Sequence, residues 1–164
     1  MGILSHPTWD IIVVLAFVAI GFFYGLSKGK QKIISTILFT YIALALQPIL
    51  PVQRIQGLTG VEDLFLLRSG LFVVTVFLLL FILGGRQRGR SALRSSSWWQ
   101  VFILAFVQAG LLIHIIFSFL PPDKVVGLAP LTRTVFANQN LHVWWLVGPL
   151  ALLALLKKLG LREE

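Results

Sequence analysis

The chain has 164 residues, and its composition excludes an ordinary soluble domain. Hydrophobic residues make up 57% of it, charged residues only 12%, and the mean hydropathy is +0.91, whereas soluble domains carry about 25% charged residues. The formal charge is +8, but the basic residues stand between apolar runs and not on one face of a soluble module, so nucleic-acid binding is not predicted. The lack of cysteine excludes disulfides, thiolate chemistry and iron–sulfur ligation.

Two long apolar runs open the chain. Seventeen residues without a charge lie between Asp10 and Lys28, and 21 lie between Lys32 and Arg54. At about 1.5 Å per residue, helices of this length match the hydrocarbon thickness of a bilayer. They are apolar all round, which leaves no face for water. We therefore expect transmembrane helices over residues 9–27 and 33–50.

Three further runs predict three further helices, over residues 69–85, 98–120 and 141–156. The last is short and contains Pro149, so we expect it to be kinked. The connections 51–68 and 121–140 mix polar with apolar residues and are predicted to be interfacial loops with partial helix, the first with a short helix near 61–67. Residues 1–164 thus form one all-α, polytopic transmembrane bundle of five helices. A four-helix alternative, with the last run on the membrane surface, stays open.

The basic residues predict the orientation of this bundle. Ten of the 14 lie in the first turn, the third connection and the carboxyl-terminal tail, whereas the other side has four basic residues and four of the six acidic ones. The positive-inside rule places the amino terminus outside and the carboxyl terminus in the cytoplasm. The turn residues that set this topology, and that we also expect to meet lipid headgroups, are Lys28, Lys30, Lys32, Arg86, Arg88, Arg90 and Arg94.

Small residues recur at helical spacing on two of the predicted helices. Gly21, Gly25 and Gly29 stand four apart on the first, so another helix can approach its backbone closely. Ala105 and Ala109, with Gly110 beside them, form a second smooth stripe on the fourth helix that could meet the first. Packing within the chain, dimerisation and contact with a foreign helix are all open interpretations of these helix-packing residues.

Polar residues inside the apolar runs are few. No carboxylate lies within them, which disfavours a proton channel of the carboxylate type. The candidates for a polar lining are Gln47, Gln108 and His114, and His114 is either functional or a neutral imidazole bonded to a neighbour. The three histidines lack regular spacing, so no metal or cofactor is expected. No catalytic constellation is visible, and the sequence predicts a protein that is not an enzyme.

The chain resembles the colicin V production protein family of small bacterial inner-membrane proteins. The resemblance covers about residues 8–120 and rests on these features: Trp9-Asp10 at the start of the first helix, Gly21 and Gly25, Lys28-Gly29, Lys32, Ile33-Ile34-Ser35, and Val107-Gln108-Ala109-Gly110-Leu111-Leu112. It implies a non-enzymatic protein of the bacterial inner membrane, linked to bacteriocin (toxin) production or export and to envelope homeostasis, sometimes as the membrane anchor of a periplasmic protease.

Two functional hypotheses follow. The first is a multi-pass membrane scaffold or accessory subunit that binds the lipid bilayer and either a protein partner or itself through its small-residue faces. The alternative is a small channel or transporter component that works as an oligomer or within a larger complex.

Overall fold

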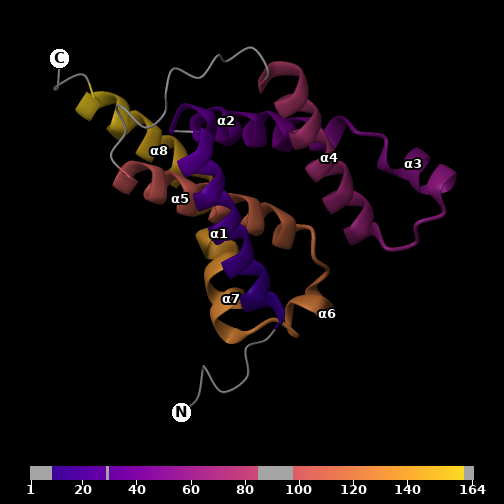
Figure 1. Cartoon of the computed structure of the whole chain (residues 1–164). Coiled ribbons are helices and arrows are strands. Elements are labelled where there is room, and N and C mark those ends of the chain that lie inside the picture. Colours follow the sequence, from indigo (N-terminus) through magenta and orange to yellow (C-terminus); the bar gives the residue numbers. More distant parts are fainter. Residues whose placement is uncertain (1–8, 29, 85–97, 161–164) are drawn as a thin grey trace.

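The computed structural model describes residues 9–28, 30–84 and 98–160, and these form helices joined by turns (Figure 1). Gly29, Arg86, Arg88, Arg90 and Arg94 lie outside the described residues. In chain order the elements are α1 (Trp9–Lys28), α2 (Lys30–Leu46), the 3-10 helix η1 (Gln47–Ile49), α3 (Val52–Thr59), α4 (Leu64–Gly84), α5 (Trp98–Ser118), α6 (Pro122–Val125), α7 (Pro130–Phe136), the 3-10 helix η2 (Gln139–Leu141) and α8 (His142–Gly160).

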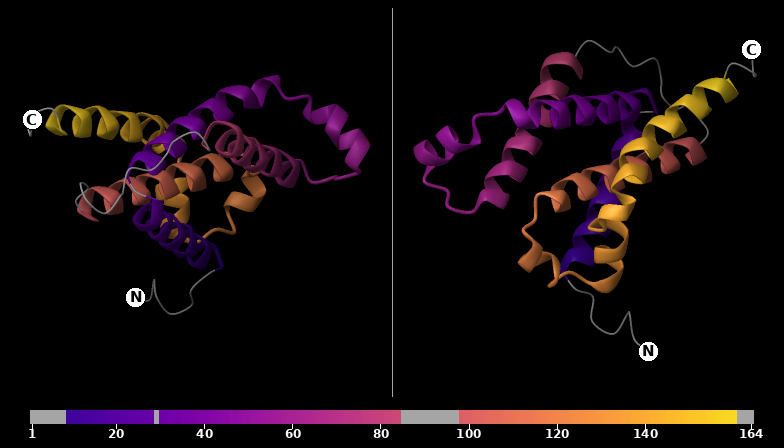
Figure 2. Two further views of the ribbon diagram at one scale, coloured as in Figure 1. Left: turned by 45° about the horizontal axis from the view of Figure 1, so that its top comes forward. Right: turned by 180° about the vertical axis from the view of Figure 1, so that it is seen from behind.

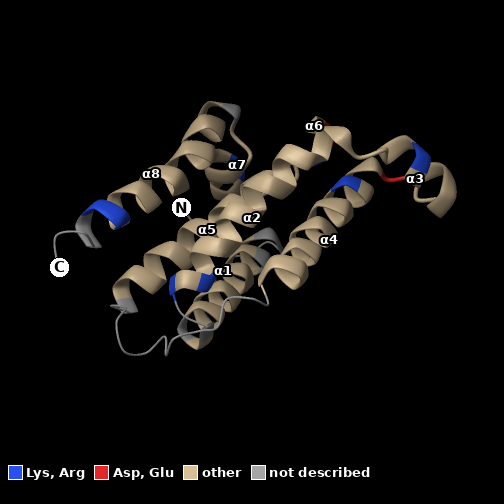
Figure 3. Cartoon of the chain, turned by 90° about the horizontal axis from the view of Figure 1, so that it is seen from above, with Lys and Arg blue, Asp and Glu red and all other residues tan. Residues whose placement is uncertain are grey.

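Three helical stretches of the described chain are long and apolar enough to cross a membrane: Lys30–Ile49, Leu64–Gly84 and Trp99–Ser118. Figure 3 shows that Lys and Arg lie at the helix ends and in the connections, and that the helical segments between them carry other residues. A charge in the hydrocarbon costs about 2.5 to 3.5 kcal/mol, so such segregation suits a bilayer. The all-helical class expected from the sequence is confirmed for the described residues.

Several helix boundaries differ from the prediction; α8, for example, extends to Gly160 instead of ending at residue 156. The α2 helix ends at Leu46 because Pro48 cannot continue it, and a 3-10 turn follows. The short helix expected near residues 61–67 lies instead at Val52–Thr59, and α4 begins at Leu64 with Arg68 in its second turn. The charge of Arg68 does not stop the helix, because its side chain is exposed at the end of the bundle.

The α5 helix lies at the centre of the fold, with α1, α2 and α8 packed on it and α4 packed on α2 (Figures 1 and 2). One core cluster joins α2 to α5 through Ile37 and Leu104, and leucines of the second half of α8 cover it. A second joins α2 and α4 to α5 through Phe72 and Leu111. In lipid, close van der Waals contact replaces the hydrophobic effect as the source of such helix association.

Two lysines form hydrogen bonds between helices at one end of the bundle. Lys30 Nζ donates to Gln100 Oε1 of α5 over 2.8 Å, and Lys32 Nζ donates to the carbonyl of Gly84, the last residue of α4. The second contact places a cation on the negative end of a helix dipole. The start of α2, the end of α4 and the start of α5 are therefore held together.

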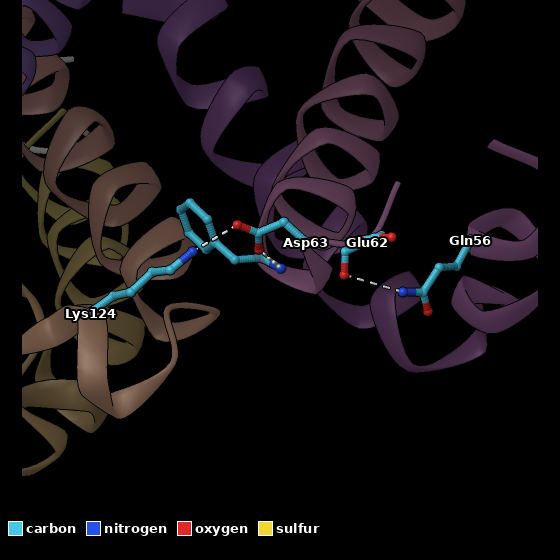
Figure 4. Close-up of polar contacts among 5 residues, drawn as sticks. Gln56, Glu62, Asp63 and Lys124 are labelled. Carbon is cyan, nitrogen blue, oxygen red and sulfur yellow. Dashed lines mark hydrogen bonds and ion pairs between the residues drawn. The ribbon is translucent and has the colours of Figure 1, made fainter. Parts of the chain in front are cut away.

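At the opposite end the two long connections contact each other. Lys124 Nζ of α6 lies 2.7 Å from Asp63 Oδ2, just before α4 (Figure 4). Asp63 also accepts the backbone N–H of Phe65, and Gln56 Nε2 donates to the Glu62 carbonyl. The hydrogen bond from Lys124 holds the pKa of Asp63 below its ordinary value, and Asp63 raises the pKa of Lys124. This ion pair links connections that are far apart in the sequence.

Candidate functional site: an apolar groove with a buried glutamine

The predicted small-residue stripes meet inside the chain, but only in part. A Cβ on Gly21 would stand 3.5 Å from the Ala105 carbonyl, so α1 and α5 lie close at that point. A Cβ on Gly25 would overlap Ile33 of α2 and Val101 of α5. These two glycines therefore serve packing within the chain.

The stripe of small residues on the fourth predicted helix suggested that Gly110 meets the first helix, but its neighbour lies in α8. A Cβ there would overlap the ring of Trp145 in α8. Trp145 stacks on Phe136 with ring centroids 5.1 Å apart, and its Nε1 donates to the Val135 carbonyl over 2.7 Å. The expectation that Gly110 faces the first helix is wrong, because successive helical residues point about 100° apart and Ala109 and Gly110 meet different partners.

A groove of about 670 Å³ runs over α5 between α1 and α4. Its floor contains Ala105, Ala109 and Gln108, and its walls are almost entirely apolar. The wall residues of α1, α2 and α4 are Phe17, Ile20, Gly21, Tyr24, Ile33, Thr36, Val73, Val76, Phe77, Leu80 and Phe81. This concave apolar surface lies along the apolar middle parts of the helices. An apolar molecule or helix can therefore enter it laterally.

Gln108 is one of the few polar residues of this groove, and the orientation of its amide is fixed by its neighbours. The Thr40 hydroxyl donates to the Thr36 carbonyl over 2.9 Å, so it accepts the hydrogen bond from Gln108 Nε2, at 3.0 Å. Gln108 Oε1 consequently points elsewhere. It is buried and has no hydrogen-bond partner, on a side chain that is only 6% exposed. An unmade hydrogen bond of this kind costs about 1 to 3 kcal/mol.

The other two candidate lining residues lie elsewhere. Gln47 is in η1, where its Nε2 lies 3.4 Å from the Arg68 carbonyl and it lines a separate cavity with Arg54 and Phe119. His114 lines a third cavity beneath α6 and α7. One copy of the chain therefore does not bring Gln47, Gln108 and His114 to one cavity.

His114 is paired with a residue that sequence reasoning did not connect to it. Its Nδ1 lies 2.6 Å from the Phe136 carbonyl, and its Nε2 lies 2.8 Å from Nδ1 of His142 in α8. The two histidines are 28 positions apart in the sequence, and this spacing gave no periodic signal. In the part of the chain that the structure describes, no group of three or more His, Asp or Glu side chains is placed to hold a metal ion.

For the described residues, the fold and the groove define a class: an all-helical protein with three helices able to cross a membrane and a largely apolar groove lined by a buried glutamine. No protein-family model, curated protein or solved structure matches the chain.

Proposed function

We propose that the protein is a non-enzymatic membrane scaffold or accessory subunit, whose groove over α5 receives a transmembrane helix of a partner protein. The observation that carries this proposal is that Gln108 lines a largely apolar groove and has a buried side-chain oxygen, Oε1, without a hydrogen-bond donor. Lipid acyl chains can fill the groove, but they have no hydrogen-bond donor. A helix with Ser, Thr or Asn among small residues fills the same space and donates to Gln108, which is how polar residues join helices in membranes.

The proposal includes five crossings with the amino terminus outside and the carboxyl terminus in the cytoplasm. The contacts of Lys30 and Lys32 support it, because they gather the start of α2, the end of α4 and the start of α5 at one end. The second half of α8 packs on the cluster at this same end. Its final lysines, Lys157 and Lys158, are exposed there, as the positive-inside rule requires of a cytoplasmic end.

Site-specific photocrosslinking tests the groove. Phe77 lines the groove and is 66% exposed, whereas Phe23 is 67% exposed and lies outside its lining. With p-benzoylphenylalanine in place of Phe77, we expect one crosslinked product of discrete mass in native membranes, and none of that mass with the same group in place of Phe23.

The variant Gln108→Leu then tests the acceptor. It keeps the groove apolar and removes Oε1, so we expect the Phe77 crosslink to fall about tenfold, as losing a hydrogen bond of about 1.4 kcal/mol implies. Gln53→Leu, on exposed α3, is the matched control. A crosslink that is absent, equal at both phenylalanines, or indifferent to Gln108→Leu would contradict a helix partner in the groove.

The resemblance to the colicin V production family, with its inner-membrane location and link to bacteriocin export and envelope homeostasis, belongs to the same proposal. The channel or transporter hypothesis is its rival. Reconstituted liposomes separate them, because a solute flux that is lost in His114→Ala would favour the rival.

A further inference from the structure

The cavity lined by His114, of about 600 Å³, lies at the end of the bundle formed by α6, α7 and the start of α8. Its size falls in the range of small-molecule sites, about 300 to 1,000 Å³. Its lining includes the apolar residues Phe117, Leu120 and Val125 and the polar residues His114, His142 and Asn138. A ligand that fits this lining has an apolar body and one polar end.

The hydrogen bonds around His114 fix where its proton lies. The Phe136 carbonyl can only accept, so His114 Nδ1 carries the hydrogen in the 2.6 Å contact. In the neutral imidazole, His114 Nε2 is then an acceptor, and His142 Nδ1 donates to it over 2.8 Å. Neutral His142 therefore has its remaining nitrogen, Nε2, as an unprotonated acceptor.

This arrangement takes up one proton and no more. A proton added at His142 Nε2 leaves both existing hydrogen bonds in place and makes the pair an imidazole–imidazolium unit. A second proton would put hydrogens on both nitrogens that face each other, and the bond between the rings would break. The cavity can thus gain a single positive charge.

Among the described residues that line the cavity there is no carboxylate. The charged side chains of α6 and α7 are Asp123, Lys124 and Arg133; all three are exposed and none lines the cavity. Lys124 is paired with Asp63. The amide nitrogen of Asn138 adds a neutral donor, because its Oδ1 already accepts the backbone N–H of Asn140.

We propose that this cavity binds a monocarboxylate with an apolar body, held by the protonated His114–His142 pair and by Asn138. The carboxylate accepts from His142 Nε2–H and the Asn138 amide, and the apolar body lies against Phe117, Leu120 and Val125. Only the protonated pair presents a hydrogen at His142 Nε2, so we expect the carboxylate to bind at acidic pH and to be lost at alkaline pH.

The chain offers a clean test, because it has only three histidines. In detergent micelles, the ¹⁵N shifts of labelled imidazoles report which nitrogen carries a proton. With His6→Gln as the background, we expect one titration step for the pair, and His114 Nδ1 to stay protonated throughout. Two independent steps, or a His114 protonated at Nε2 alone, would overturn the proposal.

Benzoate is the ligand probe, and acetate tests the apolar body. We expect saturable benzoate binding at acidic pH that is lost at alkaline pH, with acetate at least about tenfold weaker because it lacks the ring. His142→Gln keeps a donor to His114 Nε2 but cannot take a proton, so benzoate binding should vanish while the fold persists. Undetectable benzoate binding, binding independent of pH, or binding unchanged in His142→Gln would refute the site without touching the proposed scaffold role.

Discussion

The contact between Gly110 and Trp145 makes a quantitative prediction for Gly110→Ala. The added methyl would overlap the aromatic ring, and overpacking of this kind costs about 1 to 3 kcal/mol. If the ring turns away, its bond to the Val135 carbonyl is lost, at about 0.5 to 1.5 kcal/mol. Replacing glycine by alanine within a helix returns about 0.8 to 1.0 kcal/mol. The free energy of unfolding should therefore fall by about 1 to 3 kcal/mol.

Gly70→Ala is the matched control, because Gly70 lies inside α4 and nothing stands within 4 Å of its added Cβ. It should gain up to about 1 kcal/mol from helix propensity alone. The assay is reversible unfolding in mixed micelles with increasing SDS, followed by Trp145 fluorescence with the other four tryptophans replaced by Phe. If Gly110→Ala proves as stable as Gly70→Ala, the packing of α8 on α5 described above is wrong.

Three further results are expected. The stabilisation from the Asp63–Lys124 ion pair is present above the ordinary Asp pKa of 3.8 and is lost as pH falls through the lowered pKa of Asp63. The melting temperatures of the wild type and of Asp63→Asn should therefore differ at pH 6 and converge near pH 2. Lys32→Met removes a charged hydrogen bond to the end of α4 and should cost about 1.5 to 3 kcal/mol in the same micelle assay, whereas exposed Lys157→Met should cost nothing measurable. In the cysteine-free chain, Thr59→Cys should react with an impermeant maleimide in intact cells and Lys157→Cys only after permeabilisation; the reverse pattern would refute the proposed orientation.

Much of the secondary structure could be predicted from hydropathy, because residues such as those of 69–84 are apolar over a whole span. The helix starts and ends were harder to place. Arg68 was expected to lie outside its helix, but a charge one turn from the end of a helix can extend to the polar boundary without breaking the backbone. The short helix of the connection 51–68 was predicted too late in the sequence, because polar residues such as Gln53 and Arg54 obscured its periodicity.

The details of the two cavities depend on contacts that one chain segment does not specify. Spacing predicted close helix contact at Gly21 but could not predict that the half-buried ring of Trp145 packs at Gly110. The pairing of His114 with His142 needs the whole connection 121–140 to return to α5. Buried side-chain partners of this kind follow from tertiary packing and leave no local pattern.

The lysine contacts also bear on biogenesis. Lys32 and its acceptor Gly84 are 52 residues apart, and Lys30 and Gln100 are 70 apart. In the topology proposed above, the first hairpin would therefore enter the membrane with both ammonium groups at its boundary, before the carbonyl and amide that receive them have been synthesised. Until α4 and α5 are synthesised, water and anionic headgroups must solvate these ammonium groups. If synthesis stalls between the second and third predicted helices, an incompletely assembled intermediate would therefore be exposed to membrane proteases.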